Sequence, residues 1–345
     1  MANYQRDERG KLAKSRPGII AEEYLKKYPG IRSHTAVRMI IADALKKDEN
    51  NPEFTQDDYD RLRSAVRYLK GSAGNKKRAG ANTTWGKYAN DDIIDEPFSE
   101  NWDKYVIQKA SRNIFLAGDF HVPYHDKDAV RAAFEWAAEH NCDTIVLNGD
   151  VVDFYQCSRF TKNPSNPSME DELSMLQDFL WSIREMFPNA KIIYKEGNHE
   201  ARLDKYMQVK APELYKSAKL KLNDLLHFEK IGIDYVCNER VIVAGKVNIL
   251  HGHEIPGNRQ ANVAKQVFAI TNENTIVCHS HVADKTIVPT LNGTMKGAWS
   301  VPCLCGLHPK YKRVNKWTHG FLRILLQSDD TFRIFQGEIY NGKVF

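Results

Sequence analysis

Five short blocks of metal-ligand residues occur along the chain, each directly after a short apolar run. The runs cover residues 113–117, 144–148, 191–195, 247–250 and 275–278, and they are rich in Ile, Val, Leu and Tyr, as buried strands are. The carboxyl ends of strands in an open α/β sheet face the crevice where ligands bind, so distant blocks can converge there. The blocks are Asp119-x-His121, Gly149-Asp150-Val151-Val152-Asp153, Gly197-Asn198-His199-Glu200, His251-Gly252-His253 and His279-Ser280-His281.

One block alone would be interpreted as an ordinary turn, because Gly, Asp and Asn are frequent turn residues. Five blocks in series supply imidazole nitrogens, carboxylate oxygens and an amide oxygen, without an obvious competing nucleophile. This combination favours a metal site over five unrelated turns. The order of the blocks predicts two-metal hydrolysis of a phosphoester.

The blocks resemble the pattern of the calcineurin-like metallophosphoesterases, which runs D-x-H, G-D-x-x-D, G-N-H-[D/E], H-G and G-H-x-H. The resemblance extends from about Arg112 to the C-terminus and is specific, because all five blocks occur in order. It is nearest to phage-type or prokaryotic members with an extra N-terminal module. Cys278 is a departure, since the last block usually has Gly there; Gly is not a ligand, so the departure concerns the local backbone.

The resemblance implies a four-layer α/β/β/α sandwich with two divalent metal ions. One ion would be held by Asp119, His121, Asp150 and His281, and the other by Asp150, Asn198, His251 and His279. Asp150 would then bridge ions about 3.5–4 Å apart, which can activate a shared water and stabilise the attacking and leaving oxygens. Manganese is the metal expected from family habit, with iron, zinc or magnesium as alternatives for these ligands.

His199 directly follows the ligand Asn198, so it is poorly placed to reach the same metal and is predicted to act as the general acid. The resemblance places Asp153 beside His199. A carboxylate there would fix the imidazole tautomer and raise its pKa, so that a proton is available for the leaving oxygen. The alternative role for Asp153 is a helix or turn cap, and the two roles can coexist.

Three neighbouring residues have two interpretations each. His125 and His253 would either support the metal-ligating imidazoles or be solvated loop histidines. Arg202 would either meet the phosphate or form a surface salt bridge. Protein Ser/Thr phosphatases of this superfamily usually have Arg-Gly after the second acid, where this chain has Phe154-Tyr155. A phosphoprotein phosphatase is therefore disfavoured, and an aromatic residue there would stack on a base or pack under the loop.

The composition predicts a soluble globular protein of two domains: 345 residues, 42% hydrophobic and 27% charged. No apolar run approaches the roughly 18 residues of a membrane span, and no apolar region follows the charged N-terminus. We therefore expect a cytoplasmic protein without membrane contact. The six cysteines have no paired C-x-x-C spacing, so reduced thiols are expected in place of a zinc site.

The basic charge is concentrated at the front of the chain. Residues 1–90 contain 19 Lys and Arg against 11 Asp and Glu, while the remainder contains 30 against 33. Helices are predicted over 18–27, 33–47 and 55–70, a layout compatible with a helix-turn-helix in which residues at the front of the second helix would read DNA. The alternatives are protein docking or dimerisation. The predicted organisation is a helical module (1–75), a linker (76–111) and a metallophosphoesterase domain (112–345).

Residues 301–321 form a basic segment with interleaved aromatic residues, Tyr311 and Trp317. Such a mixture suits a groove for single-stranded nucleic acid, and it also occurs in loops that cover a sheet edge. The chain is thus predicted to be a binuclear metal-dependent hydrolase, a phosphodiesterase or nuclease with nucleic acid as partner. The alternatives are a phosphatase or cyclic phosphodiesterase acting on nucleotides, and a DNA-binding regulator with an inactive phosphoesterase domain.

Overall fold

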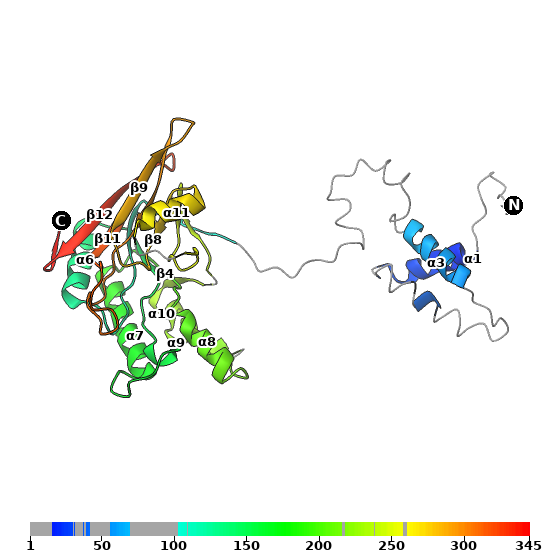
Figure 1. Cartoon of the computed structure of the whole chain (residues 1–345), viewed down its shortest axis with the longest axis horizontal. Helices are drawn as coiled ribbons and strands as arrows, with labels where there is room; N and C mark the ends of the chain where they lie inside the picture. Colours follow the sequence, from blue (N-terminus) through cyan, green and yellow to red (C-terminus); the bar gives the residue numbers. More distant parts are fainter. Residues whose placement is uncertain are drawn as a thin grey trace. The chain divides into compact units, whose positions relative to one another are not determined.

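The computed structural model describes residues 16–29, 31, 37, 39–41, 56–69, 103–108, 110–215, 218–237, 239–257 and 261–345. The chain divides into two compact units, Met1–Glu100 and Asn101–Phe345, and each is considered by itself (Figure 1). Strand β1 (Tyr105–Val106) lies inside the range predicted as a linker and pairs with the second unit. Residues 76–102 of that range lie outside the described residues.

The first unit contains the helices α1 (Arg16–Lys27) and α3 (Gln56–Leu69), close to two of the three predicted helices. Val37 and residues 39–41 are also helical, and the rest of the predicted second helix, including its predicted reading residues, lies outside the described residues. Apolar positions at helical spacing face inward in each helix. They form a small core of Ala21, Val37, Ile40, Leu62 and Val66.

The second unit contains two mixed sheets built from the strands of the described residues. The first has seven strands in the order β13-β12-β11-β2-β3-β4-β5, with β2 to β5 parallel to one another. Its antiparallel half is a hairpin that extends from β2. The strands are β2 (Asn113–Ala117), β3 (Thr144–Asn148), β4 (Lys191–Lys195), β5 (Ile233–Val236), β11 (His319–Leu326), β12 (Phe332–Tyr340) and β13 (Lys343–Val344).

The second sheet has six strands in the order β1-β6-β7-β8-β10-β9 within the described part of the chain. Strands β7, β8 and β10 are parallel neighbours, and β9 closes the edge as an antiparallel hairpin with β10. All five strand-like runs predicted from the sequence are thus strands. The remaining strands are β6 (Ile242–Ala244), β7 (Val247–Ile249), β8 (Thr275–Val277), β9 (Asp284–Pro289) and β10 (Met295–Ser300).

Three apolar layers hold the unit together as a four-layer α/β/β/α sandwich, as predicted (Figure 1). Phe115 points outward to α6 (Lys127–Glu139) and α7 (Met169–Met186), whereas its neighbour Ile114 points inward to the other sheet. Side chains alternate along a strand, and both faces of β2 are buried, so its sequence is continuously apolar. Helix α11 (Val263–Thr271) covers the outer face of the six-stranded sheet.

Side-chain caps fix where the two long helices begin. The Asp126 side chain accepts from the Ala129 amide at the start of α6. Ser168 and Asp171 form a reciprocal capping box at the start of α7, so two otherwise unpaired amides are satisfied. No helix of the described residues is long and apolar enough to cross a membrane. The shorter helices are η1 (Tyr155–Cys157), α8 (Ala201–Lys210), η2 (Ala218–Leu220), α9 (Leu222–Leu225) and α10 (Phe228–Ile231).

Candidate metal centre

The loops that follow β2, β3 and β8 are joined by hydrogen bonds that bring their blocks together. The backbone amide of Asp119 donates to the Gly149 carbonyl at 3.0 Å, and that of His121 donates to the Asp150 carbonyl at 2.9 Å. The amide of His279 donates to Asp119 Oδ2 at 2.7 Å. Blocks that are up to 160 residues apart therefore meet at one end of the sandwich.

Five predicted ligands have a left-handed backbone, which L-residues other than Gly rarely adopt. Strained backbone of this kind persists where surrounding contacts impose it, and it clusters at functional sites. The loops after β2, β3 and β8 are therefore shaped to aim these side chains. The residues are Asp119 (φ 53°), His121 (φ 51°), Asp150 (φ 50°), His279 (φ 66°) and His281 (φ 62°).

Two glycines allow the loops to approach each other. Gly149 has φ 83°, and a Cβ added there would collide with the ring of His251. A Cβ at Gly197 would collide with the Asp150 carboxylate. Glycine at these positions therefore lets two predicted ligands lie directly against neighbouring backbone.

A first cluster joins the four predicted ligands of one metal. Nε2 of His281 lies 3.2 Å from Oδ1 of Asp119 and 3.4 Å from Nε2 of His121. Nε2 of His121 lies 3.9 Å from Asp119 Oδ1 and 4.0 Å from Asp150 Oδ2. The donor atoms face one another, as they would around a shared cation.

A second cluster joins predicted ligands of the other metal. Nε2 of His251 lies 3.2 Å from Oδ2 of Asp150, and the ligand atoms of Asp150, His251 and His279 lie within 4.8 Å of one another. Asp150 belongs to both clusters. The Nδ1 atom of His251 lies 2.8 Å from the Asn148 carbonyl, a contact that leaves Nε2 to face the cluster.

The unpaired atoms of this site fit divalent cations. Oδ1 of Asp119, Oδ1 of Asn198 and Nε2 of His251 are buried without a hydrogen-bond partner in the described structure. A buried polar atom left unpaired costs about 1–3 kcal/mol, and two of these atoms, Oδ1 of Asp119 and Nε2 of His251, lie 3.9 Å apart, where a divalent cation would be a partner for both. Carboxylate and amide oxygens with imidazole nitrogens suit first-row divalent metals.

The charge of the site also favours a cation. Burial alone would lower the pKa of His251, but Asp150 and Asp119 outweigh it and raise the pKa to about 10. For His281, burial is likewise outweighed, chiefly by Asp119, and the pKa rises to about 10. Asp119 and Asp150 therefore stabilise positive charge on the two imidazoles. A bound metal ion would replace the protons of His251 and His281 as the source of that positive charge.

His199 lies at the edge of the clusters with Asp153 behind it. Its Nδ1 is 3.0 Å from Oδ1 of Asp153 and 3.0 Å from the Asp153 carbonyl, while its Nε2 is 3.7 Å from Asp150 Oδ2. Burial opposes the charged imidazole, but Asp150 and Asp153 outweigh it and raise the pKa of His199. Oδ1 of Asp153 also lies 3.2 Å from Nδ1 of His121, so one carboxylate orients two imidazoles.

Arg202 lies in the site and not on the open surface. Its Nη1 donates to the Asp153 carbonyl at 2.8 Å, and its Nη2 is 2.8 Å from Nε2 of His199. A guanidinium only donates, so in this arrangement Nε2 of His199 is the acceptor and its proton is on Nδ1. Arg202 is therefore placed to meet an anion beside His199.

The two other neighbouring histidines differ in position. The ring of His253 lies 5.4 Å from that of His251, and its Nε2 is 3.5 Å from Oε1 of Glu239. The ring of His125 lies 5.8 Å from that of Phe179, and its Nδ1 is buried without a partner among the described residues. His253 thus adjoins a predicted ligand, whereas His125 packs under α7.

Glu200 holds two of the loops together, a role that the sequence did not suggest. Its carboxylate is buried and accepts from the backbone amides of Gly197, Asp150 and Val151 at 2.8–3.0 Å, and from Tyr194 Oη at 2.8 Å. One side chain therefore fixes the Asp150 loop against the loop that carries Asn198 and His199. Because its partners are backbone amides, no sequence motif identifies them.

Replacing Glu200 with Ala is expected to destabilise the second unit by about 3–5 kcal/mol, because several buried amides lose their acceptor at once. Urea unfolding monitored by circular dichroism measures the loss. Glu170→Ala, which removes an exposed carboxylate from α7, is the matched control and should change the free energy of unfolding by less than about 0.5 kcal/mol. A loss for Glu200→Ala as small as the control would contradict the clamp role.

Glu254 has a similar supporting role at the His251 loop. Its carboxylate accepts from the amides of His251 and Gly252 at 3.1 and 2.6 Å, and it pairs with the fully buried Lys195 at 3.0 Å. Burial raises the pKa of Glu254, but Lys195 and the nearby His253 and His251 outweigh this and lower it to about 2. Glu254 is thus a charged anchor for the loop that supplies His251.

Two cysteines adjoin the ligands. Sγ of Cys305 lies 3.6 Å from Nδ1 of His281, and the ligand atoms of Cys305, His281 and His121 lie within 4.8 Å of one another, so this sulfur is a further candidate donor at the first cluster. Cys278, which departs from the family pattern, is buried, and its sulfur accepts from the Asn148 side chain at 3.2 Å. The backbone at Cys278 keeps its bond to the His251 carbonyl at 2.6 Å, so the larger side chain is accommodated by Asn148.

The family model for the calcineurin-like phosphoesterases matches residues 112–298, slightly more than half of the 345 residues. The chain belongs to this family. All five blocks lie inside the matched range. The residues beyond 298, including Cys305 and the basic segment with Tyr311 and Trp317, lie outside it.

The chain is similar to two phage proteins. It is 24% identical over 200 residues to the Gene 54 protein of Mycobacterium phage L5, covering 55% of this chain and 78% of that protein. It is 25% identical over 179 residues to the Gene 54 protein of Mycobacterium phage D29, covering 50% and 69%.

Solved structures with similarity include Vacuolar Protein Sorting 29 from Cryptosporidium parvum, with 14% identity, a TM-score of 0.39 and coverage of 68% of this chain and 94% of that one. The nuclease MPE of Pseudomonas putida has 12% identity and a TM-score of 0.30, covering 66% and 88%.

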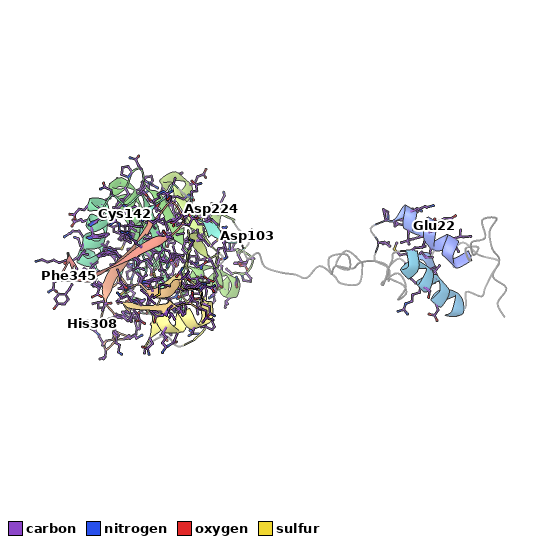
Figure 2. The ribbon with its side chains drawn as sticks, turned by 90° about the horizontal axis from the view of Figure 1, so that it is seen from above. Glu22, Asp103, Cys142, Asp224, His308 and Phe345 are labelled. Carbon is purple, nitrogen blue, oxygen red and sulfur yellow. The ribbon has the colours of Figure 1, made fainter. Side chains whose placement is uncertain are left out.

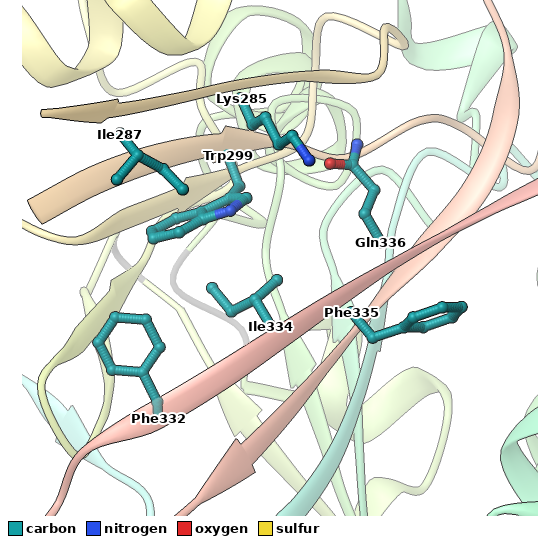
Figure 3. Close-up of a pocket in the computed structure, with 7 residues that line it drawn as sticks. All are labelled: Lys285, Ile287, Trp299, Phe332, Ile334, Phe335 and Gln336. Atoms are coloured by element: carbon teal, nitrogen blue, oxygen red, sulfur yellow. The ribbon is translucent and has the colours of Figure 1, made fainter. Parts of the chain in front are cut away.

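A pocket of about 410 Å³ lies between β9, β10 and β12, away from the predicted ligands (Figure 3). Five of its seven lining residues are aliphatic or aromatic, and Lys285 and Gln336 point toward each other at one end. No predicted ligand lines it, so the pocket is separate from the candidate metal centre. The lining residues are Lys285, Ile287, Trp299, Phe332, Ile334, Phe335 and Gln336.

Proposed function

We propose that the chain is a two-metal-dependent phosphoester hydrolase that acts on nucleic acid as a phosphodiesterase or nuclease. The observation that carries this proposal is the pair of donor clusters that share Asp150 and leave buried ligand atoms unpaired. One metal would be held by Asp119, His121, Asp150 and His281, and the other by Asp150, Asn198, His251 and His279. Metals bound there supply positive charge to the phosphoryl oxygens and activate water.

His199 is proposed to donate the proton that the leaving oxygen requires, from Nε2, while Asp153 holds the other ring nitrogen. In the ligand-free arrangement Arg202 donates to that same Nε2. Proton transfer therefore requires the guanidinium to shift from His199 and Nε2 to take up a proton from solvent, which the raised pKa of His199 favours. A substrate phosphate would compete with Asp153, whose Oδ2 lies 3.6 Å from Nη1 of Arg202, and would thereby couple binding to readiness of the acid.

Nucleic acid is proposed as the substrate because residues 1–90 have a net charge of +8 and the Arg-Gly of protein phosphatases is absent. Phe154, which stands in its place, is buried in the core and packs under the loop, so it offers no ring to a base. The intact donor set argues against an inactive regulator. Small nucleotides remain the alternative substrate class, and they are one outcome of the following experiment.

A shortened protein containing Asn101–Phe345 is expected to cleave DNA and RNA more weakly than the full chain and with a flatter salt dependence. The reason is that fewer phosphate contacts release fewer counterions. Cleavage of single- and double-stranded polymers is measured at several salt concentrations, with a nitrophenyl phosphodiester as the control that should be unaffected. Unchanged polymer cleavage and salt slope, or hydrolysis of mononucleotides and cyclic nucleotides alone, would contradict the nuclease proposal.

A further inference from the structure

The loop of residues 306–318 adjoins the site. It connects residues 303–305, which form isolated bridges with Gly118 and His125, to β11. The backbone amide of Thr318 donates to the carbonyl of the predicted ligand His281 at 3.1 Å. The ring of Trp317 lies 4.1 Å from the ring of His281. The loop is thus attached directly to the candidate metal centre.

The loop has a fixed conformation built around Asn315. The side-chain amide of Asn315 donates to the carbonyls of Leu307 and Lys312 at 2.6 and 2.7 Å, and its Oδ1 accepts from the Trp317 amide at 2.8 Å. His308, near the other end of the loop, is exposed and is labelled in Figure 2. One partly buried amide therefore orders the loop before any ligand arrives, which lowers the entropy cost of binding.

Three side chains of this loop form a layered group. Trp317 lies between His281 and the loop cations, with Nζ of Lys312 5.4 Å from its ring centre. The ring of Tyr311 lies 6.4 Å from that of Trp317 in an edge-on arrangement and is 78% exposed. We call Tyr311, Lys312 and Trp317 the aromatic platform. The exposed ring of Tyr311 leaves apolar surface in contact with water. A flat ligand that stacks on this ring would cover that surface.

The charge of the loop fits an anionic partner. Residues 306–318 contain four Lys or Arg and no Asp or Glu. Arg202, beside His199, adds a further cation at the same metal centre. Tyr311 contacts Trp317, which contacts the predicted metal ligand His281. A molecule that places a flat ring on Tyr311 and a phosphate at the metal centre has the chemistry of a nucleotide unit.

Tyr311 is also within electrostatic reach of the site. Partial desolvation, followed by the nearby Cys305 and Asp153, raises the pKa of Tyr311, while Arg202 opposes the rise. Asp153 and Arg202 are the residues that contact His199.

We infer that the aromatic platform binds a nucleobase next to the phosphoester at the metal centre, with Tyr311 as the stacking surface and Lys312 as a phosphate contact. Trp317 fixes the platform against His281. This inference rests on the proposed function, which locates the phosphoester at the metal centre. Base binding by Tyr311 is a separate claim, because hydrolysis of a phosphoester does not by itself require a stacking residue. The ligand is either a residue of single-stranded nucleic acid or a free nucleotide.

The test compares two diesters with the same leaving group, thymidine 5′-(p-nitrophenyl phosphate) and methyl p-nitrophenyl phosphate. Tyr311→Ala is expected to raise KM for the thymidine ester at least about fivefold, the low end of base stacking on an aromatic residue, with kcat unchanged. KM for the methyl ester should not change. Tyr311→Phe should restore the wild-type KM, and Tyr340→Ala, which removes a 71% exposed tyrosine from β12, is the matched control.

Equal effects of Tyr311→Ala on both esters, or no effect on the thymidine ester, would overturn the platform. A binding measurement separates this result from failure of the proposed function. By calorimetry, the manganese-loaded full chain should bind thymidine 5′-monophosphate at least about fivefold more tightly than methyl phosphate, and Tyr311→Ala should remove the difference. If neither ester is hydrolysed, the proposed function fails, and equal affinities for these two ligands then overturn the platform as well.

The source of the base is decided by comparing hexathymidylate with thymidine 5′-monophosphate as substrates. A Tyr311-dependent cleavage of hexathymidylate supports a polymer ligand. Tyr311-dependent turnover of the monophosphate alone supports a free nucleotide. Turnover of both substrates that is insensitive to Tyr311 overturns the inference.

Discussion

Replacing Asp150 with Asn is expected to abolish metal-dependent hydrolysis of a nitrophenyl phosphodiester. Oδ2 of Asp150 lies 3.2 Å from Nε2 of His251 and 4.0 Å from Nε2 of His121, so a single carboxylate faces both clusters. Its Oδ1 accepts from the His199 amide at 2.8 Å. Asn preserves the size of the side chain but removes the charge, so both metals should bind more weakly.

The expected fall in turnover is more than about 100-fold, because residues that merely support a ligand already contribute about 10–100-fold. Metal content by mass spectrometry and steady-state kinetics measure the two effects together. Asp128→Asn, an exposed acid on α6 paired with Arg131 at 3.7 Å, is the matched control and should retain both metals. Two tightly bound metals and near-normal turnover in Asp150→Asn would show that Asp150 is not the bridge.

The four-layer sandwich was implied by the family resemblance, and individual strands were predictable from the sequence where they are buried on both faces. Strands β2, β3 and β4 begin and end at the residues expected from the sequence, because each has a continuous centre of apolar or aromatic residues. The hairpin of β9 and β10 was not predicted. Most residues of β9 are exposed at the sheet edge, so its sequence is mixed and lacks that signal.

The candidate ligands could be named from the sequence because their spacing follows a family pattern. Glu200, Glu254 and Cys305 could not, since most of their partners are backbone amides, which carry no sequence signal, or groups contributed by other segments, such as Lys195 for Glu254 and the His281 ring for Cys305. Arg202 was left open between a phosphate contact and a surface salt bridge. Its position beside His199 depends on how α8 begins after the Gly197 loop, which no local pattern specifies.

Replacing His199 with Asn is expected to leave both metals bound and to lower kcat for an alkyl phosphodiester by about 10²–10⁴-fold, the usual contribution of a general acid. The structure also permits a different role, because ligand atoms of His121, Asp150 and His199 lie within 4.8 Å of one another. If His199 were a ligand, its replacement would release metal. Measuring metal content in the variant therefore distinguishes an acid from a ligand.

The leaving group provides the second criterion. Nitrophenolate departs without a proton, whereas an alkoxide requires one, so loss of the acid should harm the alkyl ester far more than the nitrophenyl ester. His227→Asn is the matched control, because His227 is exposed and has a left-handed backbone that Asn tolerates. Equal losses for both esters with both metals retained would remove His199 from the acid role. Arg202 donates to Nε2 of His199 and so lies beside the same position. In that case Arg202 would stabilise the departing oxygen through its positive charge, without transferring a proton.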